Sequence, residues 1–188
     1  VNSTLDVDMV KNTIYTGLQR LFAFDQMGVF LLDAHDERLH LSLQAGVPFA
    51  ADLQEMMAGS GLPLDAADSF IARSVVEQNN IYIHHVTQEG VDSSGVSDKI
   101  LYTSSPMKSF LLCPLLIQNK AVGTIFFVGT REPFELHDDD IESIGRYVTQ
   151  LGTAIRNAQL LQSATEARAE AEAENATKGT FLANMSHE

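Results

Sequence analysis

The hydrophobic and polar positions of this chain follow two periods, and each change of period marks a new element. Apolar residues three or four positions apart over 10–21 predict a first helix. An apolar run at 27–32, a polar turn and an apolar–polar alternation at 39–45 predict a hairpin of two strands. Two strongly apolar stretches at 110–117 and 121–129 predict a second hairpin around a short turn. The two hairpins supply most of the expected sheet.

The stretch between the hairpins predicts shorter elements. A short helix is expected at about 49–57 within an otherwise irregular segment, and a further helix at about 68–78. Residues 81–83 are typical of a short strand. The polar residues 84–108 predict a loop with one helical turn near 97–103. This part of the chain therefore adds one strand to the four of the hairpins.

The end of the chain predicts one long helix. No proline follows Pro133, and the carboxylates of residues 138–140 suit a helix N-terminus. A helix from 138 to 188 would be roughly 75 Å long at ~1.5 Å per residue, which is more than a domain of this size needs. Its apolar residues recur at spacings of three and four, a heptad pattern typical of a coiled coil, and we expect two parallel copies of the chain to pair through it. The expected dimer seam consists of Ile141, Ile144, Val148, Leu151 and Ile155.

This order of elements predicts an α+β fold with a central antiparallel sheet of five to six strands, helices packed on one face and a long C-terminal coiled-coil helix. Composition agrees with a real core, since 45% of the 188 residues are hydrophobic and 20% are charged. Lys and Arg number 12 and Asp and Glu 25, so the net charge of −13 disfavours nucleic acid and anionic membrane surfaces as partners. A single cysteine excludes an internal disulfide, and no run of about 18 apolar residues is present. We therefore expect a cytoplasmic location, with any membrane anchor lying elsewhere in a parent protein.

Two stretches of the sequence resemble GAF domains, the small-molecule sensor modules of many signalling proteins. The first joins Leu111–Ile117 to Val122–Ile125, and the second runs from Pro133-Phe134 to Ile155–Leu160. The order of the elements over residues 1–161 is also similar to that family. The resemblance implies a GAF-like fold with a pocket for a small ligand, whose identity stays open because no signature of a cyclic-nucleotide-binding GAF domain is present. A PAS-type sensor is the main alternative fold, although the two hairpins suit a GAF domain better.

The last eight residues, Phe181–Glu188, resemble the phosphoacceptor box of sensor histidine kinases. Lys178 also fits, because that family usually has a lysine three residues before the Phe. The resemblance implies that His187 is the phosphoacceptor, whose imidazole attacks the γ-phosphate of ATP, and that Glu188 is its acid/base neighbour. The family's box continues beyond the point where this chain stops. We therefore expect a fragment of a larger kinase, in which residues 162–188 form a signalling helix and the start of the dimerisation domain.

The same resemblance implies cofactors and partners. ATP and Mg²⁺ would bind a separate domain of the parent kinase, because this chain contains neither a Gly-rich ATP lid nor an Asn-containing metal box. The chain alone is therefore expected to hold no cofactor and to be inactive. The receiver domain of a response regulator would take the phosphoryl group from His187 onto an aspartate.

His84 and His85 lie where the strand at 81–83 meets the long polar loop, a region that borders the ligand pocket in GAF domains. Together with Tyr102 and Phe110, they are the predicted ligand contacts. Adjacent strand residues point to opposite faces, so the two histidines are not expected to bind one metal together. No metal site is predicted.

Cys113 lies in an apolar strand and is predicted to be a small buried side chain, unlike the attachment cysteine of a bilin-binding GAF domain. One cysteine also disagrees with GAF-type methionine sulfoxide reductases, which use several. Two alternatives to the sensor stay open. The domain could bind no ligand and serve as a dimerisation spacer, or it could be an enzyme built on His84, His85 or Cys113, for which no nucleophile–base pair is evident.

Overall fold

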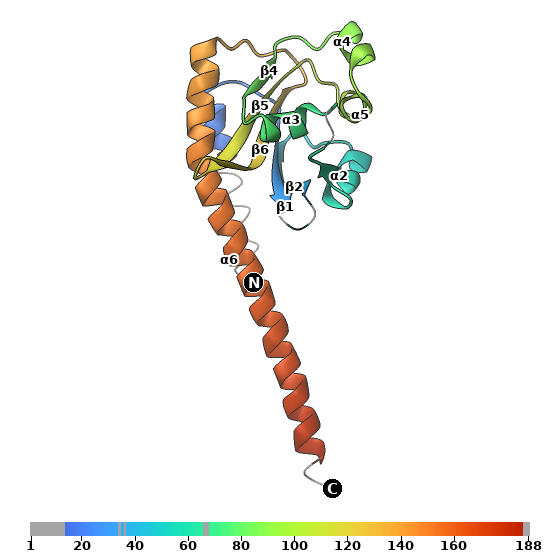
Figure 1. The fold of residues 1–188 in the computed structure, drawn as a ribbon, viewed down its shortest axis with the longest axis vertical. Coiled ribbons are helices and arrows are strands. Elements are labelled where there is room, and N and C mark those ends of the chain that lie inside the picture. Colours follow the sequence, from blue (N-terminus) through green and yellow to red (C-terminus); the bar gives the residue numbers. More distant parts are fainter. Residues whose placement is uncertain (1–13, 34, 36, 66–67, 186–188) are drawn as a thin grey trace.

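The computed structural model describes residues 14–33, 35, 37–65 and 68–185 of the chain. Its centre is a sheet of six antiparallel strands in the order β3-β2-β1-β6-β5-β4, with helices against both faces and one long helix that extends far beyond the sheet (Figure 1). The strands are β1 Gln26–Asp33, β2 Arg38–Gly46, β3 Leu62–Pro63, β4 Ile81–Ile83, β5 Ser109–Ile117 and β6 Lys120–Gly129. The helices are α2 Ala51–Ala58, α3 Phe70–Val76, α4 Gln88–Ser93, α5 Val96–Ser104 and α6 Asp138–Met185, and residues 14–19 are also helical.

The two predicted hairpins are confirmed, and they meet at the centre of the sheet. β1 pairs with β2 on one side and with β6 on the other, and β6 pairs with β5 along its whole length. The turn between β5 and β6 places Gln118 and Asn119 at φ values of 50° and 60°, the left-handed pair that a tight type I′ turn needs. The chain between β2 and β5 forms the helices α2 to α5 and the edge strands β3 and β4.

Helices cover both faces of the sheet, so the expectation of helices on one face is wrong. β5 and β6 are buried at nearly every position, as strands covered on both sides are, and each face therefore needs its own helices. One face packs on α6 and the helical residues 14–19, around Leu111 and Phe127. The other packs on α2, α3 and α5, around Leu112 and Phe126. We call these two sides the α6 face and the pocket face.

The segment between the hairpins departs from the prediction in two places. α2, α3 and β4 lie where they were expected. The expected loop with one helical turn contains two helices, α4 and α5, and α4 has no buried side chain that would produce an apolar period. β3 was not predicted, because it has only two residues. It pairs with the outer edge of β2, where Pro63 is tolerated because an edge strand can spare an N–H donor.

The beginning of α6 packs on β5, and the rest extends away from the sheet (Figure 1). Ile144 and Val148 are 2% and 0% exposed in the cluster of the α6 face, and Ile141 and Leu151 pack against it. This stripe was expected to form a dimer seam. Within the single chain the sheet covers it instead, since residues three and four apart make the same apolar face whether a sheet or a second helix covers it. The side chain of Ile155 lies outside the described residues, and pairing of two copies stays a prediction.

Candidate functional site

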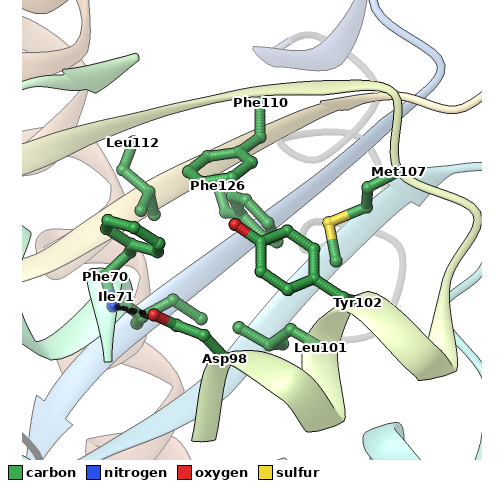
Figure 2. A pocket seen from close by; sticks show the side chains of 9 residues that line it. All are labelled: Phe70, Ile71, Asp98, Leu101, Tyr102, Met107, Phe110, Leu112 and Phe126. Atoms are coloured by element: carbon green, nitrogen blue, oxygen red, sulfur yellow. Dashed lines mark hydrogen bonds between the residues drawn. The ribbon is translucent and has the colours of Figure 1, made fainter. Parts of the chain in front are cut away.

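A cavity lies on the pocket face between the sheet and the helices α3 and α5 (Figure 2). Its empty volume is about 200 Å³, counting the part that is open to solvent, and its enclosed interior has room for little more than one water molecule. We call it the α3–α5 pocket. It is lined by Phe70 and Ile71 of α3, Asp98, Leu101 and Tyr102 of α5, Met107 of the following loop, Phe110 and Leu112 of β5, and Phe126 of β6.

Aromatic rings form much of the pocket wall. The centre of the Phe110 ring lies 5.5 Å from that of Phe70 and 6.2 Å from that of Tyr102. On the sheet side, the Phe126 ring meets the Phe110 ring nearly edge-on, with 5.6 Å between their centres. The period of two along β5 and β6 brings these two side chains to the same face. The pocket is therefore apolar except where α5 contributes polar groups.

Asp98 brings a carboxylate into this apolar wall. The residue is 3% exposed, and its two carboxylate oxygens accept from the backbone N–H of Phe70 at 3.0 and 3.2 Å. Burial raises the pKa of Asp98 to about 6. The Phe70 N–H and the Arg73 guanidinium lower this pKa, whereas the neighbouring Asp68 carboxylate raises it. Above pH 6 the pocket therefore contains a poorly solvated negative charge.

Tyr102 adds a hydroxyl to the same helix face. Burial, followed by the charge of Asp98, raises the pKa of Tyr102 to about 12, so the hydroxyl keeps its proton at neutral pH. Figure 2 shows this hydroxyl pointing toward the space between Phe70 and Phe126, and no residue drawn there hydrogen-bonds it. The hydroxyl is thus a donor and acceptor in the wall of the pocket, whose accessible inner surface is apolar.

Two carboxylates tie the beginnings of α3 and α5 together. Asp98, in the first turn of α5, accepts from α3 as described above. Asp68, just before α3, accepts from the backbone N–H and the hydroxyl of Ser97, both at 3.3 Å. Gly95 permits this close approach, because a Cβ there would lie 2.1 Å from the Cβ of Asp68. The crossed contacts fix the two helices that wall the pocket.

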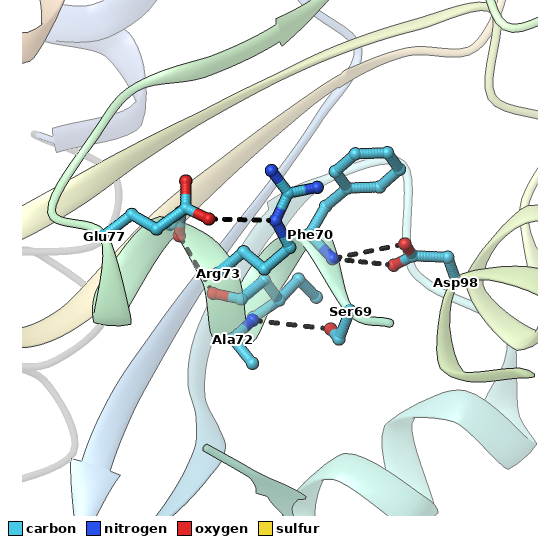
Figure 3. A network of polar contacts seen from close by, with 8 residues as sticks. Ser69, Phe70, Ala72, Arg73, Glu77 and Asp98 are labelled. Carbon is cyan, nitrogen blue, oxygen red and sulfur yellow. Dashed lines mark hydrogen bonds and ion pairs between the residues drawn. The ribbon is translucent and has the colours of Figure 1, made fainter. Parts of the chain in front are cut away.

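The first turn of α3 is held by further polar contacts (Figure 3). The Ser69 side chain accepts from the Ala72 N–H at 3.4 Å and caps the helix. The guanidinium carbon of Arg73 lies 5.6 Å from the centre of the Phe70 ring, and its Nε lies 3.2 Å from Oε1 of Glu77. Arg73 therefore contacts one lining residue, Phe70, while it forms its ion pair with Glu77.

Two of the four predicted ligand contacts, Tyr102 and Phe110, line the pocket, whereas the two histidines do not. His84 and His85 follow the end of β4, and their rings stack at 4.1 Å with 21° between the planes. The expectation that they point to opposite faces is wrong, because the chain bends at His84 and strand alternation no longer applies. His84 Nε2 lies 3.7 Å from Oε1 of Glu135, apart from the pocket.

Asp98 was not among the predicted contacts, and it is the residue that gives the pocket its charge. It lies in the segment that was expected to be mostly loop. A signal for it existed, since Leu101 and Tyr102 follow Asp98 by three and four positions, the spacing of one helix face. Phe70 and Phe126 were also not predicted as contacts, because a core residue and a pocket residue have the same apolar pattern.

Strand β5 joins the pocket to α6. Phe110 and Leu112 line the pocket, whereas Leu111 and Cys113, which alternate with them, pack in the cluster that contains Val148 of α6. All five of these side chains are buried. A displacement of the pocket wall therefore acts on a strand whose other face supports the long helix.

Comparisons with known proteins decide the family. A family model described as GAF domain matches residues 4–156. The chain belongs to the GAF domain family. A solved structure of similar fold is the GAF domain of a two-component sensor histidine kinase from Bacillus halodurans, which is 22% identical with a TM-score of 0.63 and covers 82% of this chain and 97% of that chain.

Two further solved structures of similar fold come from proteins of other kinds. The blue-light absorbing form of the PixJ GAF domain from Thermosynechococcus elongatus is 10% identical, has a TM-score of 0.59 and covers 89% of this chain and 95% of its own. The type II free methionine-R-sulfoxide reductase from Thermoplasma acidophilum is 13% identical and has a TM-score of 0.57. The match covers 80% of this chain and 94% of that chain. At such identities the likeness shows the fold alone, and the PAS-type alternative is set aside. A search of curated proteins found no match to this sequence.

Cys113, the single cysteine of this GAF domain, is buried as predicted. It lies on the α6 face at 0% exposure, and burial raises the pKa of its thiol far above the usual range. The thiol therefore supplies neither a nucleophile nor an attachment point to the α3–α5 pocket, which lies on the other side of the sheet.

The remaining predictions concern metals, membranes and phosphorylation. Among the residues that the structure describes, no group of three or more His, Cys, Asp or Glu side chains is placed to hold a metal ion. In the same part of the GAF domain and its helix, none of the helices combines the length and the apolar character needed to cross a membrane. His187 and Glu188 lie outside the described residues, so their roles stay predictions.

Proposed function

We propose that this GAF domain is the sensory module of a two-component histidine kinase, and that α6 relays the state of the α3–α5 pocket toward the phosphoacceptor His187. The observation that carries the proposal is the position of β5, because one of its faces lines the pocket while the other supports α6. The GAF domain of a sensor histidine kinase among the similar structures agrees with it. The resemblance of residues 181–188 to a phosphoacceptor box agrees as well.

In this proposal the relay acts through packing. A ligand held between α3 and α5 presses on Phe110 and Leu112, and a shift of β5 alters the contacts of Ile144 and Val148 on the opposite face. Protein interiors are close-packed, so such a shift is transmitted rather than absorbed. A signal also requires that the ligand bind one of two positions of α6 more tightly than the other. Because α6 is continuous over Asp138–Met185, a change at its beginning moves its far end.

The proposal includes pairing of two copies through the part of α6 beyond the sheet. Leu160 and Leu161 are 55% and 67% exposed there and are available to a second helix, whereas Val148 is already buried. In the parent kinase, a separate domain would supply ATP and Mg²⁺ to His187, Glu188 would assist the proton transfer, and a receiver domain would then take the phosphoryl group.

Phosphorylation of the full-length parent kinase tests the proposal. With radiolabelled ATP and Mg²⁺, the wild type is expected to form an acid-labile phosphohistidine, and His187→Gln is expected to lose the label. His35→Gln is the matched control, because His35 is exposed on the β1–β2 turn, and it should keep the label. Undiminished labelling of His187→Gln would contradict the assignment.

The second candidate is a GAF domain that binds no ligand and spaces the two copies of a kinase. The small interior of the α3–α5 pocket favours it. Thermal melting against a metabolite library separates the two candidates, because a compound that binds only the folded state stabilises it by about 2.7 kcal/mol at a hundred times its Kd. A reproducible rise in Tm with one compound supports the sensor, and a flat response across the library supports the spacer.

A further inference from the structure

We propose that the α3–α5 pocket binds a small organic cation, a protonated primary amine with a short apolar body, whose ammonium group pairs with the Asp98 carboxylate. This inference rests on the proposed function, since it names the class of ligand for the pocket in which that function begins. It is carried by the juxtaposition of one buried carboxylate and one hydroxyl with aromatic rings, in a cavity otherwise lined by apolar side chains.

Asp98 is a buried anion without a matching cation. Its two oxygens share one donor, the Phe70 N–H, whereas a carboxylate can accept about four hydrogen bonds. Within the described part of the chain, no Lys, Arg or His side chain forms an ion pair with Asp98, and Arg73 pairs with Glu77 instead. A buried charge without a partner is unfavourable, so a ligand that brings a cation and N–H donors to Asp98 stabilises the occupied pocket.

The rings around Asp98 suit the same class of ligand. Phe70, Phe110 and Phe126 line the cavity, and the face of an aromatic ring attracts an ammonium group within about 6 Å of its centre. An anion would meet the Asp98 charge in a chain whose net charge is −13. A neutral molecule would leave the carboxylate unpaired. Charge therefore selects the amine over ligands of the same shape.

The size of the pocket limits the amine. Its enclosed interior has room for about one water molecule, so the ammonium group can enter only if α5 moves away from the sheet, while the apolar body stays in the part of the pocket that is open to solvent. A primary ammonium group has three N–H donors, and the acceptors that α5 contributes to the lining are the Asp98 carboxylate and the Tyr102 hydroxyl, one helical turn apart. A quaternary ammonium is bulkier and has no N–H donor, so it satisfies neither the space nor the hydrogen bonds.

Asp98 also caps α3, and the two roles make different predictions. A cap needs only a hydrogen-bond acceptor, which Asn supplies as well as Asp. Pairing with an ammonium group needs the negative charge. Asp98→Asn therefore keeps the cap and removes the proposed ligand partner.

An NMR titration of the 188-residue chain with three probes tests the inference above neutral pH. Isobutylamine, isobutanol and isobutyrate share one carbon skeleton and differ in charge. The Phe70 amide is the reporter, because it donates to Asp98. Isobutylamine is expected to shift this amide along a saturable, millimolar curve, isobutanol to bind at least about tenfold more weakly and isobutyrate to cause no shift.

Variants complete the test. The affinity of Asp98→Asn for isobutylamine should fall at least about tenfold, whereas Asp92→Asn, which removes an exposed carboxylate of α4 outside the lining, should keep it within about twofold. The comparison of the three probes needs only the wild type, so it holds even where a variant fails to fold.

Three outcomes would overturn the inference: equal affinity for isobutylamine and isobutanol, full affinity in Asp98→Asn, or no shift with any probe. The first two leave the pocket as a ligand site and the proposed function intact. The third outcome contradicts the inference alone, because the phosphorylation of His187 tests the proposed function without these probes.

Discussion

The two faces of the sheet are covered in different ways. On the α6 face, aromatic rings interlock, with the Phe127 ring centre 5.2 Å from that of Phe22 and 5.0 Å from that of Phe24. The pocket face contains the cavity and most of the buried polar groups of the described residues. These are Gln26, Ser69, Ser74, Asp98, Ser105 and Thr124, while Ser109 lies on the α6 face. The α6 face is thus filled by apolar side chains, whereas the pocket face combines apolar packing with a small cavity and buried polar side chains, of which Asp98 lines the cavity.

Phe126 and Phe127, which are neighbours on β6, allow the two faces to be compared directly. Phe127→Ala is expected to cost about 3–5 kcal/mol of unfolding free energy, because it leaves a large hole in closely packed rings. Phe126→Ala should cost about 1 kcal/mol less, since one side of its ring already borders the cavity. Urea unfolding measures both. Equal losses would show that the pocket face is packed as densely as the α6 face.

Gly95→Ala should separate the two helices that wall the pocket. The added Cβ would lie 2.1 Å from the Cβ of Asp68, so the beginnings of α3 and α5 must move apart, at a cost of about 2 kcal/mol. Gly90→Ala is the control, because its Cβ would meet only the Thr87 hydroxyl oxygen at 3.3 Å. Chemical denaturation of both variants checks the prediction, and a harmless Gly95→Ala would disprove the crossed contacts.

Asp98→Asn tests the buried carboxylate of the pocket face through the pH dependence of the unfolding free energy. Burial raises the folded-state pKa of Asp98 to about 6, above its unfolded value of 3.8, so its contribution to stability is present below pH 3.8 and is lost as the pH rises through about 6. The variant lacks this titration and should be more stable than the wild type by on the order of 1 kcal/mol at pH 8. Near pH 4 the difference should shrink toward zero.

Unfolding curves at both pH values measure this effect. Asp92→Asn is the matched carboxamide control, because Asp92 is exposed on α4 and lies outside the pocket lining. A constant difference between Asp98→Asn and the wild type from pH 4 to pH 8 would contradict the buried charge.

Leu160→Glu should have the smallest effect on the stability of the domain. Leu160 lies beyond the sheet and is 55% exposed, so the free energy of unfolding should change by less than about 0.5 kcal/mol. Sedimentation should nevertheless show weaker self-association if two copies pair through this part of α6. Ala167→Glu is the control for added charge, because Ala167 is an exposed residue of the same helix.

The elements that could be predicted from the sequence are those whose own residues carry a local pattern. Both hairpins, α2, α3, β4 and α6 have an apolar period or a turn signal in their own residues. α4 and β3 have neither, because α4 buries nothing and β3 has two residues. The stripe that contains Ile144 and Val148 shows a further limit, since its pattern predicts a buried face but not which partner buries it.

The site was less predictable than the fold because it depends on contacts distant in sequence. Tyr102 and Phe110 were predicted, but Asp98 acquires its role only when Phe70, 28 positions earlier, brings the α3 N–H to it. Strand alternation was applied to His84 and His85, although the strand ends just before them. Residues that a sequence places in a polar loop can therefore form a pocket wall.

A double-mutant cycle across β5 measures whether the pocket face and α6 are coupled. Leu112→Ala acts on the pocket face and Val148→Ala on the α6 face, and we expect their effects on unfolding free energy to be coupled by more than about 0.5 kcal/mol. Leu39→Ala, a buried leucine of the pocket face on β2, should combine additively with Val148→Ala. Additivity of Leu112→Ala and Val148→Ala within about 0.3 kcal/mol would contradict a relay through β5.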